Sequence, residues 1–485
     1  MKKLIFVSVF GLVSLVSFMF YRASNLESMQ IHPEPIEFVE LDDNIVLKNL
    51  SKAIQYKTIS SEDRSETDPK PFIAFHSFLK RTYPRIFKNL DVETFNGLSI
   101  LIKWEGSDSD KLPALLMAHM DVVPATGDWD FDPFSGEISD GYIWGRGSID
   151  DKSSMMGILE SVEYLLRKGH KPSRTIYLAF GHDEENTGND GAREIAKTLQ
   201  ERNVYFEFVL DEGMIIAENL IDGINSPVAM VGVAEKGYAT FELTSSSDGG
   251  HSSMPGESTS IGQLSKAITM LDENPMEATL TSPVKGLFKF IGPEMSSKDK
   301  FVFANQDILS SVIVSELEKS TSTNAMVRTT IAPTMIEGGI KENILPRSSS
   351  AIVNFRIIPG QKIKDVKSHI EETLSEMDIK ITLLDRNMFS EPSKVSSMDS
   401  ESFTMIQKTI MEVFPDVVFA PSIVLGGTDS RYFSRLSRDI YRFMPIKLKV
   451  EDVSMIHGLN EKISTQSYLS MVQFYIQLVS NIDAL

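Results

Sequence analysis

Four short apolar runs along the chain have the pattern of buried strands, and each ends in acidic, histidine or glycine residues. Runs of this kind, bounded by polar residues and glycines, are typical of the strands of a parallel α/β sheet, which are buried on both faces. Such sheets bind their ligands beyond the carboxyl ends of the strands, where this chain places its charges. Because acids that are buried together need a countercharge, the pattern predicts a metal centre. The runs are LPALLMAHMD (112–121), TIYLAFGHDEE (175–185), YFEFVLDEG (205–213) and SIVLGGTDS (422–430).

A helical pattern and two alternating patterns complete the predicted architecture. The segment from Ser153 to Lys168 repeats apolar residues at helical spacing directly after an acidic turn at 149–151, which makes a strand–turn–helix unit of a parallel sheet. Further on, residues 240–248 and 351–360 alternate like strands with one buried face. We therefore predict an α/β fold, with a mostly parallel sheet flanked by helices, and an inserted α+β domain.

The predicted catalytic domain has two parts, residues 42–235 and 389–485, and the inserted domain covers residues 236–388. At the N-terminus two lysines precede an apolar stretch, so residues 1–22 are predicted to be a signal peptide or a membrane anchor. The polar, proline-bearing residues 23–41 are predicted to be a tether. These segments indicate an exported protein of the cell envelope or periplasm, either anchored in the membrane by its N-terminal segment or secreted.

Composition limits the kinds of site that the chain can build. Over 485 residues the net charge is −19, which argues against nucleic acid and anionic membrane surfaces as partners. The chain has no cysteine, so disulfides, thiolate zinc sites and a cysteine nucleophile are excluded. Any metal ion must therefore be held by histidine, aspartate and glutamate. A contact with a membrane is expected only through the N-terminal segment.

Two of the eight histidines, His119 and His457, stand in acid-rich loops next to predicted strands. A single histidine is more often a hydrogen-bonded structural residue than a metal ligand. His119 has a stronger case because Asp121 lies two residues further on, on the same side of an extended strand. A carboxylate in that position can accept the second ring N–H of the histidine and fix its tautomer, as is common for metal-bound histidines.

Three acidic pairs are the remaining candidates for chemistry. Asp150-Asp151 close a glycine-rich turn, which also suits a helix cap, whereas a phosphate-binding loop would need a third glycine at position 150. Glu184-Glu185 lie among glycines that favour a tight turn, although a solvated run of charges is the simpler interpretation. Adjacent acids can divide their roles, one as metal ligand and one as general base. Asp211-Glu212 are a further pair at a strand end.

Eight motifs, taken together, make the chain resemble a known family. Their order is similar to that in the co-catalytic zinc metallopeptidases of the carboxypeptidase S and aminoacylase family, from about residue 45 to the C-terminus. The resemblance is closest to the carboxypeptidase S branch, which includes secreted N-fatty-acyl amino acid hydrolases. Each motif is weak by itself, but eight in the same order are specific. The motifs are HMDVVP, GRGSIDDK, HDEENTG, VLDEG, GGHSSMPG, GGIKENILP, GGTDSRYF and IHGLNE.

The resemblance implies a site with two zinc ions, for which Co²⁺ or Mn²⁺ are alternatives. It implies Glu184 as the general base that takes a proton from a metal-bridged water, and Asp121 as the residue that orients His119. It also implies a cis peptide bond between Asp150 and Asp151. The implied metal ligands are His119 and Asp211 for one ion, Glu185 and His457 for the other, and Asp150 for both.

The inserted domain resembles the family's lid, so a homodimer through this domain is expected. His251 matches a histidine that reaches the partner's active site in family dimers, whereas a histidine in a Gly/Ser loop is by itself usually just exposed. Asn343 and Arg356 match residues that hold polar groups of the substrate, and a solvated salt bridge is the alternative for Arg356. Residues that match the wall of the site, or add a carboxylate contact, are Gly427, Thr428, Asp429 and Arg431.

These features predict a zinc-dependent hydrolase of amide bonds in substrates with a free C-terminal carboxylate, either small peptides or N-acyl amino acids. Two alternatives stay open: a catalytically inactive binding protein on the same fold, and a two-metal hydrolase of another ester or amide class. Four apolar residues of the lid either form its core or bind a lipophilic acyl chain. They are Leu287, Phe288, Phe290 and Ile291.

Overall fold

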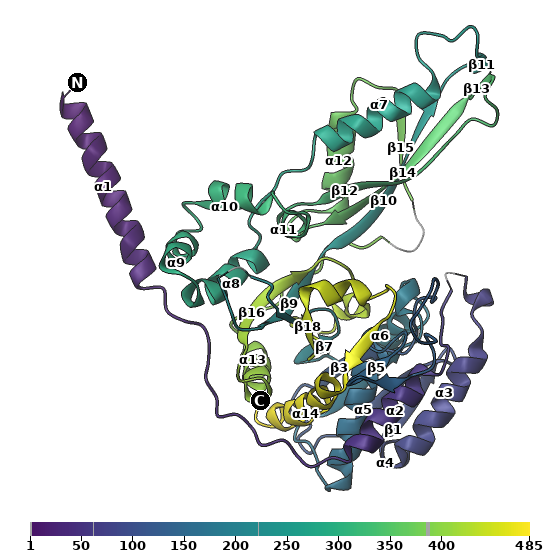
Figure 1. Cartoon of the computed structure of the whole chain (residues 1–485), viewed down its shortest axis with the longest axis vertical. Coiled ribbons are helices and arrows are strands. Elements are labelled where there is room, and N and C mark those ends of the chain that lie inside the picture. The colour runs from purple at the N-terminus through teal and green to yellow at the C-terminus, as the bar shows by residue number, and fades with distance from the viewer. Residues whose placement is uncertain (1, 62, 222, 385–388) are drawn as a thin grey trace.

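A mixed sheet lies at the centre of the larger domain (Figure 1). The computed structural model describes residues 2–61, 63–221, 223–384 and 389–485. Over these residues the sheet has ten strands, in the order β1-β2-β6-β3-β7-β17-β9-β8-β18, with β16 paired to β9. The strands are β1 (Asp91–Phe95), β2 (Ser99–Trp104), β3 (Ala114–His119), β6 (Ile176–Gly181), β7 (Phe208–Asp211), β8 (Ile216–Glu218), β9 (Val228–Glu235), β16 (Val418–Val424), β17 (Ile440–Arg442) and β18 (Lys447–Lys449).

The sheet contains strands from all four predicted runs, and its middle is parallel. β3 pairs in parallel with β6 and with β7, and β17 pairs in parallel with the other side of β7. β16, from the fourth run, pairs in parallel with β9. β3 ends at His119, β6 at Gly181 and β7 at Asp211, so one edge of the sheet collects the acidic and histidine residues. The α/β fold class with an inserted domain is confirmed.

Two apolar layers cover the faces of the sheet. Leu116 and Leu178 belong to the layer that includes α5 and α14, whereas Leu115 and Ala179 belong to the layer of α6. Successive residues of a strand point to opposite faces, so a run that is apolar throughout buries both of its faces. The helices of the larger domain are α2 (Asp43–Ile54), α3 (Pro69–Thr82), α4 (Pro84–Asn89), α5 (Lys152–Arg167), α6 (Ala192–Glu201), α13 (Glu401–Val413) and α14 (Thr465–Ile482).

A second sheet in this domain connects two loops that are far apart in the sequence. It has the order β19-β5-β4 over the described residues, with β4 at Ile138–Ser139, β5 at Tyr142–Trp144 and β19 at Lys462–Ser464. Trp144 of β5 pairs with Lys462 of β19. Because β5 leads into the Asp150 turn and β19 follows the loop of His457, this pairing brings the two loops together.

The inserted domain is built on an antiparallel sheet of order β12-β14-β10-β15. β10 alternates buried and half-buried residues, as predicted for a strand with one buried face. Its buried side chains pack with those of α7 and α12. A small pair of strands, β11 and β13, forms the tip that lies farthest from the catalytic sheet (Figure 1). The elements are β10 (Gly237–Ser246), β11 (Gly250–His251), α7 (Ser260–Glu273), β12 (Thr330–Gly338), β13 (Ile344–Leu345), β14 (Ser348–Ile357), α12 (Ile363–Thr373) and β15 (Ile379–Leu383).

Four helices inside the predicted lid belong to the core of the catalytic domain instead. Phe290 of α8 packs against Phe403 and Phe419, with ring centroids 5.9 and 5.8 Å away. The four apolar residues for which a lid core or an acyl site was considered, 287, 288, 290 and 291, are all buried in the larger domain's core. The structure therefore corrects both interpretations. The helices are α8 (Ser282–Ile291), α9 (Ser297–Ala304), α10 (Ser310–Leu317) and α11 (Thr321–Val327).

The N-terminal helix α1 (Lys2–Ser24) projects from the molecule and is held at its C-terminal end (Figure 1). The rings of Phe20 and Phe301 lie 4.8 Å apart, and the Asn305 side chain donates a hydrogen bond to the carbonyl of Met19 at 3.1 Å. Within the described part of the chain, no helix combines the length and the apolarity that crossing a bilayer requires.

Residues 25–42, most of the predicted tether, form a strap that crosses the catalytic domain. The side-chain amide of Gln30 pairs with both backbone groups of Phe419, at 2.8 and 3.0 Å. The amide of Gln473 pairs in the same way with Val39, at 3.0 and 2.9 Å. The predicted tether is thus attached to the catalytic domain, because apolar residues spaced along the polar segment pack on the core. These are Met29, Ile31, Ile36, Val39 and Leu41.

Candidate active site

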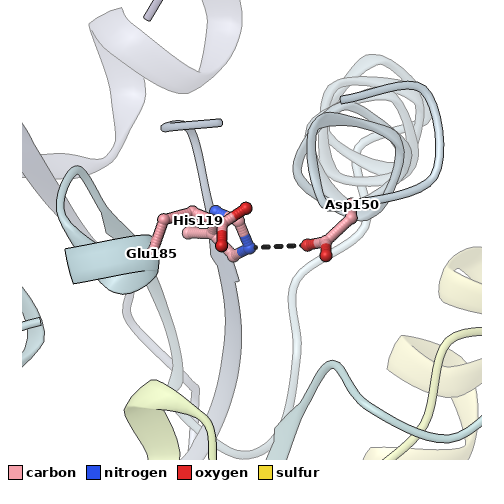
Figure 2. Close-up of side chains that lie close together, drawn as sticks. All are labelled: His119, Asp150 and Glu185. Carbon is pink, nitrogen blue, oxygen red and sulfur yellow. Dashed lines mark hydrogen bonds and ion pairs between the residues drawn. The ribbon is translucent and has the colours of Figure 1, made fainter. Parts of the chain in front are cut away.

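Side chains from four separate segments meet at the carboxyl edge of the sheet. His119 ends β3, Asp150 lies in the turn before α5, and Glu185 lies in the turn after β6. Figure 2 shows these three side chains converging from their separate elements. Nε2 of His119 lies 3.0 Å from Oδ1 of Asp150, and Nε2 of His457 lies 3.0 Å from its Oδ2. Asp150 thus turns one oxygen toward each histidine, which is the arrangement of a bridging carboxylate.

The donor atoms of this cluster suit a divalent metal ion. One donor atom from each of His119, Asp150 and Glu185 lies within 4.8 Å of the others. His457 joins them, because its Nε2 lies 3.1 Å from Oε2 of Glu185. The second oxygen of Glu185 is buried and has no hydrogen-bond partner among the described residues. Histidine and carboxylate donors are the ligands that zinc takes when no thiolate is present.

The electrostatics of the cluster also call for a positive charge. Hydrogen bonds to Asp150 and Glu185 raise the pKa of His457 to about 10. Burial, together with the neighbouring Glu212, raises the pKa of Glu184 well above its ordinary value. Burial likewise raises the pKa of Glu212. Protons are therefore held by groups that a bound divalent cation would keep deprotonated, the carboxylates as anions and the histidine as the neutral ring.

Asp121 supports the cluster from behind. One of its oxygens lies 3.3 Å from Nδ1 of His119, so the expected contact that orients the histidine is present. Its carboxylate also accepts the backbone N–H groups of Glu184 and Glu185, at 3.2 and 3.1 Å. Ser60 donates a further hydrogen bond to it at 2.7 Å. One buried carboxylate thus fixes a histidine and the turn that carries both glutamates. The contribution of Ser60 had no signal in the sequence.

The third predicted strand end differs from expectation in one residue. Oε1 of Glu212 lies 3.4 Å from Nε2 of His119, and these two residues form a second candidate metal group with Asp151. Asp211 instead accepts a hydrogen bond from the backbone N–H of Ser430 at 2.8 Å. The position beside His119 that was predicted for Asp211 is therefore taken by Glu212. Neighbouring residues of an extended segment point to opposite sides, so only one of this pair can reach His119.

The turn of Asp150 has the expected backbone. The peptide bond between Asp150 and Asp151 is cis, as predicted. Asp151 is buried and accepts the backbone N–H of His119 at 3.3 Å. The turn is thereby attached to the end of β3, next to the histidine that shares the cluster with Asp150.

The predicted substrate wall lies against the segment in which β9 passes into the inserted domain, which we call the hinge. Thr428 donates both its N–H and its hydroxyl to Glu235, at 3.1 and 3.2 Å. Glu235, the last residue of β9, also pairs with the fully buried Arg442 at 3.0 Å. Arg356 lies on β14 with its guanidinium over the ring of Tyr238, 4.5 Å from the centroid. Glu235 and Arg442 carried no signal in the sequence that marked them as parts of this wall.

Two predicted site residues lie away from the cluster of their own chain. His251 and Asn343 are exposed at the tip of the inserted domain (Figure 1). The ring nitrogen Nδ1 of His251 accepts hydrogen bonds from the N–H and hydroxyl of Ser253. The backbone carbonyl of Asn343 accepts the N–H of Ser252 at 3.3 Å. A single chain therefore does not bring these two residues to the metal cluster.

Comparison with known proteins shows which protein family the chain resembles in sequence and in fold. Residues 115–481 match the description "Peptidase family M20/M25/M40". The chain is 41% identical over 452 residues to an N-fatty-acyl-amino acid synthase/hydrolase of Xenopus tropicalis, covering 92% of this chain and 88% of that protein. It is 40% identical over 460 residues to a probable carboxypeptidase S-like protein of Dictyostelium discoideum, covering 93% and 88%. Among solved structures, an M20 family metallo-carboxypeptidase of Sulfolobus solfataricus has a similar fold, with a TM-score of 0.67 at 18% identity and coverage of 91% and 99%.

Proposed function

Because the chain belongs to peptidase family M20/M25/M40, we propose that it uses two zinc ions to hydrolyse an amide bond next to a free C-terminal carboxylate. Metal-dependent amide hydrolysis of small peptides or N-acyl amino acids is the activity that the family and its named relatives support. The observation that carries the proposal is the position of Asp150, which turns one oxygen to each histidine at 3.0 Å.

The proposed ligands follow from the donor atoms of the cluster. Asp150 would contact both ions, His119 and Glu212 one of them, and Glu185 and His457 the other. When bound, such a pair of ions supplies a Lewis acid that lowers the pKa of water and polarises the amide carbonyl. The same residues could bind cobalt or manganese ions in place of zinc.

Glu184 is the proposed general base. Its backbone is fixed by Asp121, and its turn places it beside the ligand Glu185. A carboxylate with a raised pKa can take a proton from the attacking water and then deliver it to the nitrogen of the leaving amine. An inactive binding protein on the same fold is disfavoured, because Glu184 and a full set of candidate ligands are present.

Replacing Glu184 tests this assignment. Glu184→Gln should still bind two zinc ions but should lose turnover by about 10²–10⁴-fold, because only proton transfer is removed. Hydrolysis of a panel of N-acyl amino acids and dipeptides, with zinc content measured on the same samples, gives both quantities. Glu201→Gln, at an exposed carboxylate, is the control and should behave like the wild-type protein. Near-normal turnover by Glu184→Gln would remove Glu184 from the mechanism.

The carboxylate of the substrate is proposed to bind at the hinge side of the site. Arg356 can hold a carboxylate with two hydrogen bonds, and Thr428 of the predicted wall is held by Glu235 at the end of β9. Asn343 would have to come from a second copy of the chain, because in its own chain it is exposed at the tip of the lid. Both substrate classes, small peptides and N-acyl amino acids, carry the carboxylate that this arrangement would bind.

We also propose a homodimer in which the tip of one lid completes the site of its partner. The tip carries several exposed apolar side chains, among them Met254, Ile336 and Ile340, the last of which is 93% exposed. A second copy of the chain would cover them and bring His251 and Asn343 to a metal cluster. In that position His251 could stabilise the oxyanion of the intermediate.

Mixing two inactive variants tests the dimer. Chains with His251→Ala and chains with Glu184→Gln should each be inactive, but a hybrid dimer has one site with both residues intact. At equal amounts and random pairing, half of the dimers are hybrids, so about a quarter of wild-type activity should return. If the mixture is as inactive as its components, His251 does not act in the partner's site.

The N-terminal segment supports export, since two lysines precede an apolar helix. A signal peptide or an anchor would both give this pattern. N-terminal sequencing of the mature protein would distinguish them, because only a signal peptide is removed.

A further inference from the structure

A buried carboxylate, that of Glu461, lies under the turn that carries Asp150. Its side chain has no exposed surface. Oε1 accepts the backbone N–H groups of Ile149 and Asp150, at 2.7 and 3.1 Å. Both oxygens lie 3.1 Å from the N–H of Gly147, and Oε2 pairs with the guanidinium of Arg146 at 2.6 Å. This carboxylate therefore has donors on all sides.

The glycine-rich turn thus binds an anion from within the same protein. Gly147 has φ +87°, a backbone conformation that few other residues adopt, and its N–H points at Glu461 as a result. Successive N–H groups that converge in this way form a concave anion site. In the sequence GRGSID, Gly147 donates its N–H to the carboxylate of Glu461, and Gly145 donates its N–H to the backbone carbonyl of the same residue at 2.8 Å.

The same contacts hold the loop of His457. Arg146 donates one hydrogen bond to Glu461 and a second to the carbonyl of Gly458 at 2.9 Å, so its guanidinium spans both ends of this loop. The ring of Trp129 covers the guanidinium at 5.2 Å. Because Gly458 follows His457 directly, a shift of this contact would move the histidine.

His457 needs such support. Its side chain is 51% exposed, and its backbone has φ +58°. Among the described residues its ring pairs only with the acids of the cluster, Asp150 and Glu185. Packing therefore does little to fix its position, and the loop around it must do so.

We propose that Glu461 is a positioning residue that sets the separation between Asp150 and His457, and with it the affinity for the ion that these two residues share. The inference rests on the proposed function, because it needs a metal ion at that place. Charge-assisted hydrogen bonds are stronger than neutral ones, so the ionised carboxylate is well suited to join two loops that are more than 300 residues apart. Groups that hold metal ligands in place commonly change metal affinity or activity by about 10–100-fold when they are replaced.

The test is zinc binding by Glu461→Gln. The amide has the size of the carboxylate, but its NH₂ group would face donors, either Gly147 or Arg146. Zinc should be titrated into the metal-free full-length chain against a chelator of known affinity, with circular dichroism as a check of the fold. We expect the ion that also uses His457 to bind about 10–100-fold more weakly, and the other ion, which shares only Asp150 with this loop, to be weakened less.

Two further variants make the result specific. Arg146→Lys keeps the charge but cannot span Glu461 and Gly458, so it should lower the affinity for the same ion to a smaller degree. If Glu461→Gln does not fold, Arg146→Lys provides the test. Glu160→Gln is the matched control, because Glu160 is a partly buried carboxylate of α5 that accepts hydrogen bonds from Asn49 and Tyr83 at 2.7 and 2.9 Å. This control should bind both ions with wild-type affinity.

The outcomes separate the two proposals. If the wild-type protein binds two zinc ions and both Glu461→Gln and Arg146→Lys do so with unchanged affinity, the positioning role is overturned and the proposed function stands. Equal weakening of both ions would also overturn it, because a general loss of structure explains that result. A wild-type protein that binds no zinc would contradict the proposed function itself.

Discussion

Asp211 and Glu212 are adjacent acids with different surroundings, and this difference allows their roles to be separated. Glu212 faces His119, whereas Asp211 accepts the N–H of Ser430 in the substrate wall. Glu212→Gln should therefore lose the ion at His119, and Asp211→Asn should keep both ions while disturbing the wall. Zinc content after dialysis against a weak chelator measures the difference. The opposite pattern, with an ion lost only from Asp211→Asn, would restore Asp211 as the ligand.

At this scale the sequence predicted the kinds of residue in the site better than their individual positions. His119, Asp150, Glu185 and His457 come together because strand ends of a parallel sheet share an edge. Which of two neighbouring acids faces inward depends on the rotation of the chain after β7, and no pattern in the sequence reports it. Glu461 was within a recognised motif, but its role arises from a contact across more than 300 residues.

The two segments that join the inserted domain to the catalytic domain form a short ladder. Tyr238 and Ser390 exchange two backbone hydrogen bonds at 2.8 Å, and the N–H of Ser393 bonds to the carbonyl of Glu235 at 3.1 Å. Between them the buried Lys236 donates hydrogen bonds to two carbonyls at the end of α11, at 2.9 and 2.8 Å. The hinge is thus attached to the helices that pack on the catalytic core.

Lys236 should make stability depend on pH. Burial lowers its pKa to about 7, whereas in the unfolded chain it is about 10.4. Between these values the unfolded chain binds more protons, so the contribution of Lys236 to the free energy of unfolding rises with pH, by at most about 1.4 kcal/mol per pH unit. Comparing the urea midpoints of the wild-type protein and Lys236→Met at pH 7, 8 and 9 isolates this contribution.

The urea midpoint of Lys236→Met should rise less steeply between pH 7 and pH 9 than the urea midpoint of the wild-type protein. Lys266→Met, at an exposed lysine of α7, should run parallel to the wild-type protein. If the curve of Lys236→Met is parallel as well, the lysine is not titrating in the hinge.

Across the whole molecule, local patterns predicted the sheet and the inserted domain, but they did not predict which helices pack on which of the two domains. The change from continuous to alternating apolar patterns marks the insertion, because a sheet with one exposed face leaves that signal. The helices α8–α11 lie inside the insertion by sequence and pack on the catalytic core in space. The apolar side chains of these helices require an apolar partner, but the sequence does not identify it, and the same holds for the strap.

Two deletions measure the contribution of the strap. Removing residues 1–24 takes away α1, whereas removing residues 1–41 also takes away nearly all of the strap and its contacts to Phe419 and Gln473. The longer deletion should lower the free energy of unfolding by about 5 kcal/mol more, since five half-buried apolar side chains contribute about 1 kcal/mol each. Thermal melting of the two proteins provides the comparison, and equal melting temperatures would mean that the strap contributes nothing.

The strap has a consequence for the order in which the protein is made. Val39 leaves the ribosome early, but its partner Gln473 follows 434 positions later. Domains usually fold during synthesis from the N-terminus onward. In this protein the first segment of the folded unit has to wait, with its apolar side chains uncovered, until almost the last helix has emerged. A chain that stops even 20 residues short would lose the surface that the strap needs, so we expect shortened products to remain substrates for chaperones and proteases rather than active enzymes.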